Sequence, residues 1–437
     1  MVDPAVLPDV TITAESEIID EGETTTLRWT ASNATSITIE PGIGNVQASG
    51  SIEVSPTEIT TYTVTATGPA GSTTTSVRVI LPPKADLMVT PQYIRPGDST
   101  TLKWNTTNTD SCVIEPGIGA VDLNGSMSIS PSETTTYTIT VAGPGGSYTK
   151  DITVSVISLA VSINSPLDGD IIYRPDTSVT GTVTNIPGCE TGVTVNGVTA
   201  LVSDNKFTAD HVPLEEGDNE ITVSVVDADG FTLSETISVS VYLEENYISL
   251  KADEYSGVSP FKTILTVDGS FSINEDPNIT YSGSGDVNII KINGESSYNI
   301  EITEPGLYSI TAEAQYEGNT YSDSIDILVM DNGSLDGLLK AKWNGMRKAL
   351  VDGDVEDAIK YFTIEKKDSY EEVFQLYANQ IGNVIANAEE IESVKLTSRK
   401  AKYLLDFTVN ENGELKTYST YVIFYLDSDG IWRIHFF

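Results

Sequence analysis

The stretch DEGETTTLRW at residues 20–29 recurs 75 positions later as RPGDSTTLKW at residues 95–104. The same offset holds without a gap through IEPGIG, which stands at residues 39–44 and again at 114–119. Self-similarity at a fixed period is the sequence signature of repeated folded units. The chain therefore opens with two tandem copies of one domain.

Each copy has the pattern of short β-strands. Residues 61–66 alternate threonine with apolar side chains, and glycine, proline and asparagine turns interrupt such runs. A strand of this kind buries one face and exposes the other, so a core requires two sheets packed together. Trp29 and Trp104 occupy equivalent strand positions, and we expect both to lie between the sheets. Cys112 aligns with Ile37 and fits the same core.

On GETTTLRW, PGIG and PTEITTYT, the two copies resemble the bacterial immunoglobulin-like repeats found in tandem on secreted and surface proteins. The resemblance implies an immunoglobulin-like β-sandwich at residues 8–82 and another at 83–157. It implies an extracellular location more than an activity, because sandwiches of this type host many functions.

Two further β domains with different sequences are expected next. Residues 158–243, with VTVNG at 193–197, look like the immunoglobulin-like accessory domains found beside secreted bacterial polysaccharide enzymes. Residues 244–331, with EPGLYSITA at 304–312, are similar to polycystic-kidney-disease-type sandwiches. We therefore expect a multidomain, mainly β protein that begins with four immunoglobulin-like sandwiches in a row.

The periodicity changes in the last domain, at residues 332–437. Residues 335–351 place apolar side chains at three- and four-residue steps, which predicts an amphipathic helix. A later helix is predicted to begin at Ser369 with a capping box, and four strands follow, with hairpin turns at Asn412-Gly413 and Asp429-Gly430. The domain resembles the nuclear-transport-factor-2-like family, which implies a cone-shaped α+β fold. That family includes enzymes, ligand binders and scaffolds.

Charge is distributed unevenly along the chain. The 437 residues carry 24 Lys and Arg against 63 Asp and Glu, a net charge of −39, which excludes nucleic acid as a natural partner. Residues 1–333 account for −35 of this charge. No apolar run reaches the roughly 18–20 residues of a membrane span. The start at residues 1–4 lacks the features of a signal peptide, and we expect that one was removed from a secreted, cell-surface or periplasmic protein.

Asp227 and Asp229, in DADG at residues 227–230, are candidate calcium ligands because alternate carboxylates supply the oxygens that this ion prefers. The competing interpretation is a β-hairpin turn, where aspartate and glycine are common. We favour the turn, and we expect no other cofactor.

A pocket in the C-terminal cone is the second candidate site. Strand alternation places Arg433 and His435 on one face of the last strand. Tyr403 or Asp406 on a neighbouring strand would complete an acid–base pair, as in some enzymes of the resembling family. The competing interpretation is that these polar groups are solvated at the surface.

A local basic cluster stands out in an acidic chain: Lys395, Arg399, Lys400 and Lys402. The cluster suits docking to an acidic surface, either one of the protein's own sandwiches or an anionic polysaccharide. The alternative is a solvated hairpin edge whose lysines deter strand pairing.

The sequence favours a non-enzymatic bacterial protein that acts in adhesion, in the envelope or in extracellular structure. We assign no catalytic residue, because no nucleophile elbow, phosphate-binding loop or zinc-protease motif is present. A rod of sandwiches would present the C-terminal module to protein or glycan partners. The alternatives are a carbohydrate-binding accessory protein and a small-molecule enzyme or ligand binder in the cone. The oligomeric state stays open.

Overall fold

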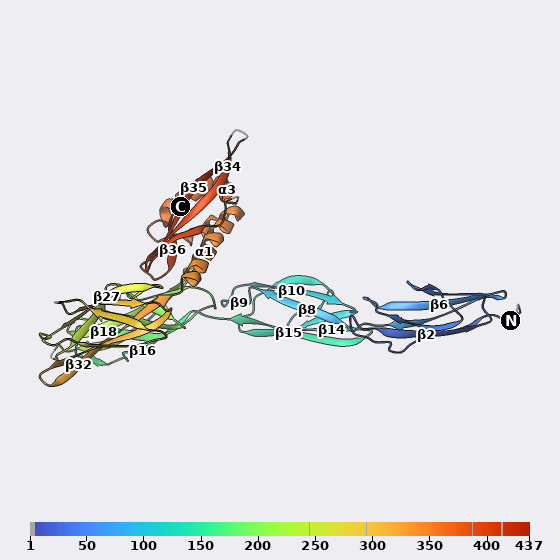
Figure 1. Ribbon diagram of the computed structural model, residues 1–437, viewed down its shortest axis with the longest axis horizontal. Coiled ribbons are helices and arrows are strands. Elements are labelled where there is room, and N and C mark those ends of the chain that lie inside the picture. Colours follow the sequence, from blue (N-terminus) through green and yellow to red (C-terminus); the bar gives the residue numbers. More distant parts are fainter. Residues whose placement is uncertain (1–4, 244, 294, 387, 412–413) are drawn as a thin grey trace. The chain divides into compact units, whose positions relative to one another are not determined.

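The computed structural model describes residues 5–437 apart from 244, 294, 387 and 412–413. The predicted turn at Asn412-Gly413 and residues 1–4 thus lie outside the described residues. Contacts between residues divide the chain into two compact units, Met1–Ile157 and Ser158–Phe437. Strands dominate both units (Figure 1).

The first repeat folds as two facing antiparallel sheets, because its threonine-rich strands bury only their apolar positions. Trp29 is buried in the core between the sheets. The sheet orders are β1-β2-β5 and β4-β3-β6-β7. The strands are β1 (Asp9–Ala14), β2 (Thr25–Ser32), β3 (Ser36–Glu40), β4 (Gly44–Asn45), β5 (Ser49–Val54), β6 (Thr60–Gly68) and β7 (Gly71–Val79).

The second repeat copies this plan, with Trp104 and Cys112 in its core as expected. Its sheet orders are β13-β10-β8 and β12-β11-β14-β15-β9. Gly50 and Gly125 are equivalent positions that face the tryptophans, and a Cβ there would lie 2.6 and 2.7 Å from the two indole rings. The strands are β8 (Lys84–Thr90), β9 (Tyr93–Ile94), β10 (Thr100–Thr107), β11 (Ser111–Glu115), β12 (Gly119–Val121), β13 (Gly125–Ile129), β14 (Thr135–Gly143) and β15 (Gly146–Val156).

The third domain, which opens the second unit, is another two-sheet sandwich with a valine-rich core. Its sheets run β16-β18-β22-β21 and β17-β24-β23-β19-β20. The strands are β16 (Ala160–Ser165), β17 (Ile171–Ile172), β18 (Asp176–Thr184), β19 (Thr191–Val195), β20 (Val198–Thr199), β21 (Leu201–Ser203), β22 (Lys206–Pro213), β23 (Gly217–Asp227) and β24 (Thr232–Val241).

The fourth domain pairs the sheets β25-β27-β30-β29 and β26-β32-β31-β28 around its own core. The strands are β25 (Ile248–Ala252), β26 (Ser256–Val258), β27 (Phe261–Gly269), β28 (Asn278–Ser282), β29 (Val287–Lys291), β30 (Ser297–Ile302), β31 (Gly306–Tyr316) and β32 (Asn319–Met330).

The C-terminal domain is α+β, with helices packed on the antiparallel sheet β33-β34-β35-β36. Trp343 and Trp432 lie in its core. The elements are α1 (Asn332–Asp352), α2 (Val355–Ile359), α3 (Lys367–Ala386), β33 (Glu392–Leu396), β34 (Lys400–Glu411), β35 (Glu414–Leu426) and β36 (Trp432–Phe436). Helix α3 begins before Ser369, so the predicted capping box is wrong.

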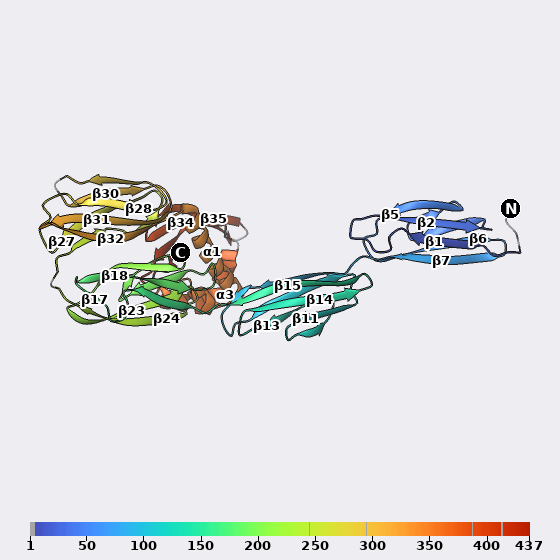
Figure 2. The same ribbon diagram turned by 90° about the horizontal axis from the view of Figure 1, so that it is seen from below.

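The expected row of sandwiches is not the arrangement within the second unit. The third and fourth sandwiches lie side by side (Figure 2) and are joined by the ion pair between Arg174 and Asp323. The C-terminal domain contacts the third through an ion pair between Lys342 and Glu190. Helix α1 begins two residues after β32 ends, and Met330, the last residue of β32, packs against the core of the C-terminal domain. The flanks of these domains meet instead, with paired charged side chains between them.

Candidate functional site

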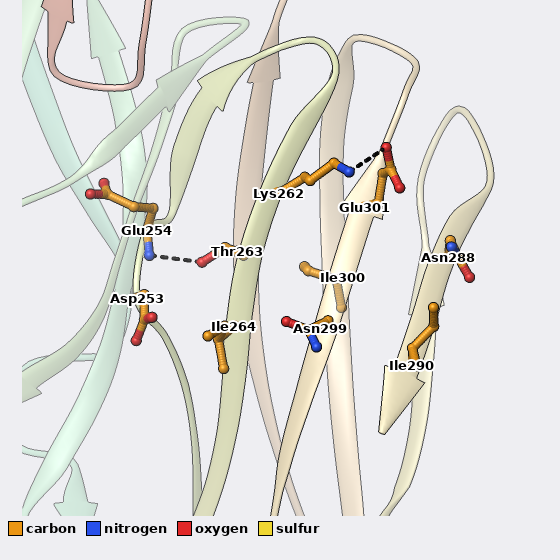
Figure 3. Close-up of a pocket in the computed structure, with 10 residues that line it drawn as sticks. All are labelled: Asp253, Glu254, Lys262, Thr263, Ile264, Asn288, Ile290, Asn299, Ile300 and Glu301. Carbon is orange, nitrogen blue, oxygen red and sulfur yellow. Dashed lines mark hydrogen bonds and ion pairs between the residues drawn. The ribbon is translucent and has the colours of Figure 1, made fainter. Parts of the chain in front are cut away.

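The fourth domain has a hollow of about 590 Å³, lined by polar and aliphatic side chains, on the outer face of its β25-β27-β30-β29 sheet (Figure 3). Strand register brings side chains together there in two rows across β27, β30 and β29. One row is Lys262, Glu301 and Asn288, and the next is Ile264, Asn299 and Ile290. A sheet face lined by amides, a carboxylate and aliphatic side chains can hydrogen-bond a ligand and also contact its apolar surface.

The loop Asp253-Glu254 borders this hollow, and one backbone acceptor and one side-chain acceptor of β27 hold it in place. The Asp253 N–H donates to the carbonyl of Ile264 at 3.0 Å, and the Glu254 N–H donates to Thr263 Oγ1 at 2.9 Å (Figure 3). These bonds hold the loop at the edge of the hollow, with the Glu254 carboxylate directed away from Lys262 and Asn299 (Figure 3).

A second cavity, of about 430 Å³, lies where the third, fourth and C-terminal domains meet. Asp253 and Glu254 line it as well, so the two hollows share one loop. Each domain contributes to its wall, including Glu190 and Leu201 from the third, Tyr255 and Leu328 from the fourth, and Arg399 and Trp432 from the C-terminal domain.

A β-bulge in the third domain supplies the side chains that join it to the fourth. The register of β18 and β22 shifts between Thr177 and Val179, opposite Asp210 and His211. His211 has φ of 53°, a left-handed conformation that is rare for a residue with a side chain. Bulges of this kind redirect side chains. Here Asp210 reaches β32 of the fourth domain, where its Oδ2 accepts from the N–H of Asp326 at 2.8 Å.

His211 and Arg174 form a part-buried charge network with two aspartates. Arg174 donates to Asp323 at 2.7 and 3.3 Å and to Asp176 at 2.6 Å. His211 Nδ1 lies 2.8 Å from Asp176 Oδ2, and Nε2 lies 2.5 Å from the Leu250 carbonyl. Both ring nitrogens face acceptors, and only the imidazolium donates from both. The network therefore holds His211 in its charged form.

The pKa shifts in this network agree with that assignment. Burial alone would lower the pKa of His211, but the hydrogen bond and charge of Asp176 raise it above its ordinary value. Burial opposes ionisation of Asp176 too, yet His211 and Arg174 lower its pKa. Burial raises the pKa of Asp210. From the shifts of His211 and Asp176, the contact between the third and fourth domains is most stable at a pH where His211 is charged and Asp176 is ionised.

The C-terminal domain docks on the third through Glu190. Lys342 Nζ lies 2.5 Å from Glu190 Oε2, with the two side chains 10% and 13% exposed, and the Trp432 N–H donates to Oε1. The turn before β36 contacts β19 so closely that a Cβ on Gly192 would lie 2.0 Å from the Asp429 carbonyl oxygen. Any side chain at Gly192 would therefore displace this turn.

The candidate calcium ligands lie in a hairpin turn between β23 and β24. Asp227 is buried, and its Oδ1 accepts from the N–H groups of Asp229 and Phe231, both at 3.0 Å. Asp229 is exposed. Among the described residues, no group of three or more His, Cys, Asp or Glu could hold a metal ion.

The structure does not bring the four predicted cone residues together. Arg433 is buried and donates to Asp427 at 3.1 Å and to Asp429 at 2.7 Å, which fixes the turn that docks on the third domain. Burial alone would lower the pKa of Arg433, but these carboxylates raise it. His435 sits at a register shift between β35 and β36, where its Nδ1 lies 3.2 Å from Thr363 Oγ1.

Tyr403 and Asp406 lie on opposite faces of β34. Tyr403 is fully buried against the helices, and burial, together with the nearby Asp336 carboxylate, raises its pKa. Asp406 is half-buried and pairs in register with Ser419, away from β36. The hollow in this domain is a different one, of about 490 Å³ and mainly apolar lining, between α3 and β34–β35 with Phe407 and Phe437 in its wall.

The basic cluster lies around the hairpin of β33 and β34. Lys402 and Lys400 cover tyrosine rings of β35, with Nζ 3.4 Å from the Tyr421 centroid and 5.1 Å from the Tyr425 centroid. Lys395 pairs in register with Lys402, and Arg399 lines the three-domain cavity. Cation–π contacts of this kind hold lysines on a sheet face.

Sequence reasoning missed the residues that join the domains. Arg174 and Glu190 both lie in loops without a recognisable motif. Arg174 bonds Asp323, which lies 149 positions away, and Glu190 bonds Trp432, which lies 242 positions away. His211, one of only two histidines in the chain, was the available signal.

Part of the chain matches a known family. The family model for glucodextranase domain B matches residues 160–243, the third domain. An uncharacterized protein of Ruminiclostridium cellulolyticum is 36% identical over 146 residues, which cover 32% of this chain and 40% of that protein. The chain thus spans less than half the length of this relative.

Solved structures of similar type are chains of β-sandwich domains. Invasin, a bacterial integrin-binding protein, is 14% identical with a TM-score of 0.26, over 74% of this chain and 79% of invasin. The D1–D4 fragment of ICAM-5 is 10% identical with a TM-score of 0.27, over 74% of this chain and all of that fragment. In the described part of the chain, no helix is long and apolar enough to cross a membrane.

Proposed function

We propose that this is a non-enzymatic bacterial protein, secreted or held at the cell surface, that works by binding. The two repeats serve as a spacer, and the second unit is the binding or assembly module. The observation that carries this proposal is the docking of three domains by two ion pairs between largely covered side chains, Arg174 with Asp323 and Lys342 with Glu190. Such contacts hold a composite surface in one geometry, which a binding module requires.

The C-terminal domain is, in this proposal, a nuclear-transport-factor-2-like fold used as a scaffold. Support comes from its helices packed on a four-stranded sheet and from Arg433, which the domain uses to fix a docking turn. The small-molecule alternative is favoured by the apolar hollow beside Phe407. Its lining suits an apolar ligand rather than acid–base catalysis.

A carbohydrate-binding accessory role is the second candidate. It is supported by the match of the third domain to glucodextranase domain B and by the amide-lined hollow next to it. Partners at the cell surface would then be glycans as well as proteins.

The proposal is tested by incubating the labelled full chain with purified bacterial cell envelopes and measuring the retained fraction. We expect saturable retention that a tandem of the two repeats does not compete away. A retained fraction no higher than that of an unrelated acidic protein would contradict the proposal.

A further inference from the structure

We propose that the hollow of the fourth domain and the cavity at the three-domain junction form one groove for a neutral polysaccharide chain. This inference rests on the proposed binding function and names its ligand class. The groove is defined by Asp253, Glu254, Asn288, Asn299, Tyr255 and Arg399 with their neighbours.

The lining of the first hollow suits hydroxyl groups. Exposed Asn288 and Asn299 each offer donors and an acceptor from one side chain, and Asp253 adds acceptors at the edge (Figure 3). Ile264 and Ile290 flank Asn299 in the same row. A sugar ring presents hydroxyls at its edge and C–H groups on its faces, so it can use both kinds of contact at once.

Charge favours a neutral ligand. Lys262 is the cation of the first hollow, and its Nζ lies 3.1 Å from Glu301 Oε1. Asp253 and Glu254 place negative charge on the loop that both hollows share. A polyanionic chain would meet these carboxylates along its path, which opposes its binding.

The two hollows border the same loop, so together they form a groove longer than either hollow alone. The two hollows measure about 590 and 430 Å³, each within the range of ligand pockets. The second adds Tyr255, a half-buried aromatic side chain, and Arg399. A linear polymer can therefore pass from the sheet face, over Asp253-Glu254, to the junction.

The experiment measures binding of the full chain to an immobilised panel of neutral polysaccharides, namely dextran, a β-glucan, mannan, xylan and galactan. Polygalacturonate and alginate serve as acidic counterparts. The variants are N299A and E254Q in the groove and N278A as a matched control, because Asn278 is exposed on β28 in the other sheet of the same domain. Thermal unfolding of each variant checks that the domain folds.

We expect at least one neutral polysaccharide to bind, with about tenfold weaker binding for N299A and no change for N278A. Equal binding by all variants, or binding of the acidic polymers alone, would overturn the inference. Retention on cell envelopes without binding to any neutral polymer would overturn it and leave the proposed function standing. Failure of both assays would remove the proposed function as well.

Discussion

Replacing Arg174 with methionine tests the buried network that joins the third and fourth domains. The guanidinium reaches Asp323 at 2.7 Å and Asp176 at 2.6 Å, and these side chains are only 8% and 13% exposed. Removing one partner of a buried ion pair costs roughly 3–5 kcal/mol, because the remaining charge stays buried. Arg174 is itself 23% exposed, and Asp323 keeps the N–H of Leu250, so we expect the lower end, about 3 kcal/mol.

Scanning calorimetry of the full chain measures this loss. A cost of about 3 kcal/mol predicts that the unfolding temperature of the second unit falls by about 5 °C. The control is K262M, because Lys262 and Glu301 form an exposed pair in the same unit, 67% and 36% exposed. Exposed pairs contribute about 0–1 kcal/mol, so that variant should shift the transition by about 2 °C or less. Equal shifts for the two variants would refute the reasoning.

Two other perturbations probe the contacts between domains, and a third probes the core of the first repeat. Because the pKa of His211 is raised in the folded state, its stabilising charge is fully present below the ordinary pKa and is lost as pH rises through the higher folded value. Calorimetry should therefore show a lower unfolding temperature of the second unit at pH 9 than at pH 6. The variant H211Q should flatten this pH dependence. Substituting Lys342 with methionine leaves the Glu190 carboxylate without its cation and should cost about 3 kcal/mol, measured as faster proteolysis within the C-terminal domain; an unchanged rate would argue against docking. The variant G50V should displace Trp29 and destabilise only the first repeat, by about 1–3 kcal/mol, measured by the tryptophan emission shift during urea unfolding.

The sandwiches could be predicted from the sequence because their determinants are local. Alternation of polar and apolar residues along a strand decides which face is buried. Trp29 and Trp104 occupy the same position in the two repeats, so the sequence marks the same core position twice. The helices and strands of the last domain follow from periodicity in the same way. The predicted start of α3 at Ser369 failed because the helix begins at Lys367, so Ser369 lies inside it.

The candidate site could be predicted only in part. Alternation placed Arg433 and His435 on one face, but a register shift in β36 and the carboxylates of Asp427 and Asp429 decide what these side chains contact. Contacts between domains depend on which surfaces meet, and no local pattern records that. The hollow of the fourth domain likewise arises from register between strands, which the sequence of one strand does not contain.

The most direct test of the locked second unit is hydrogen exchange at two backbone amides of the full chain. The amides of Asp326 and Trp432 donate to carboxylates of the third domain, Asp210 and Glu190. If the three domains dock as one body, both amides should exchange about as slowly as their neighbours in the strand ladders. Exchange of both amides at the rate of an exposed loop, with the neighbouring strands still protected, would contradict the account.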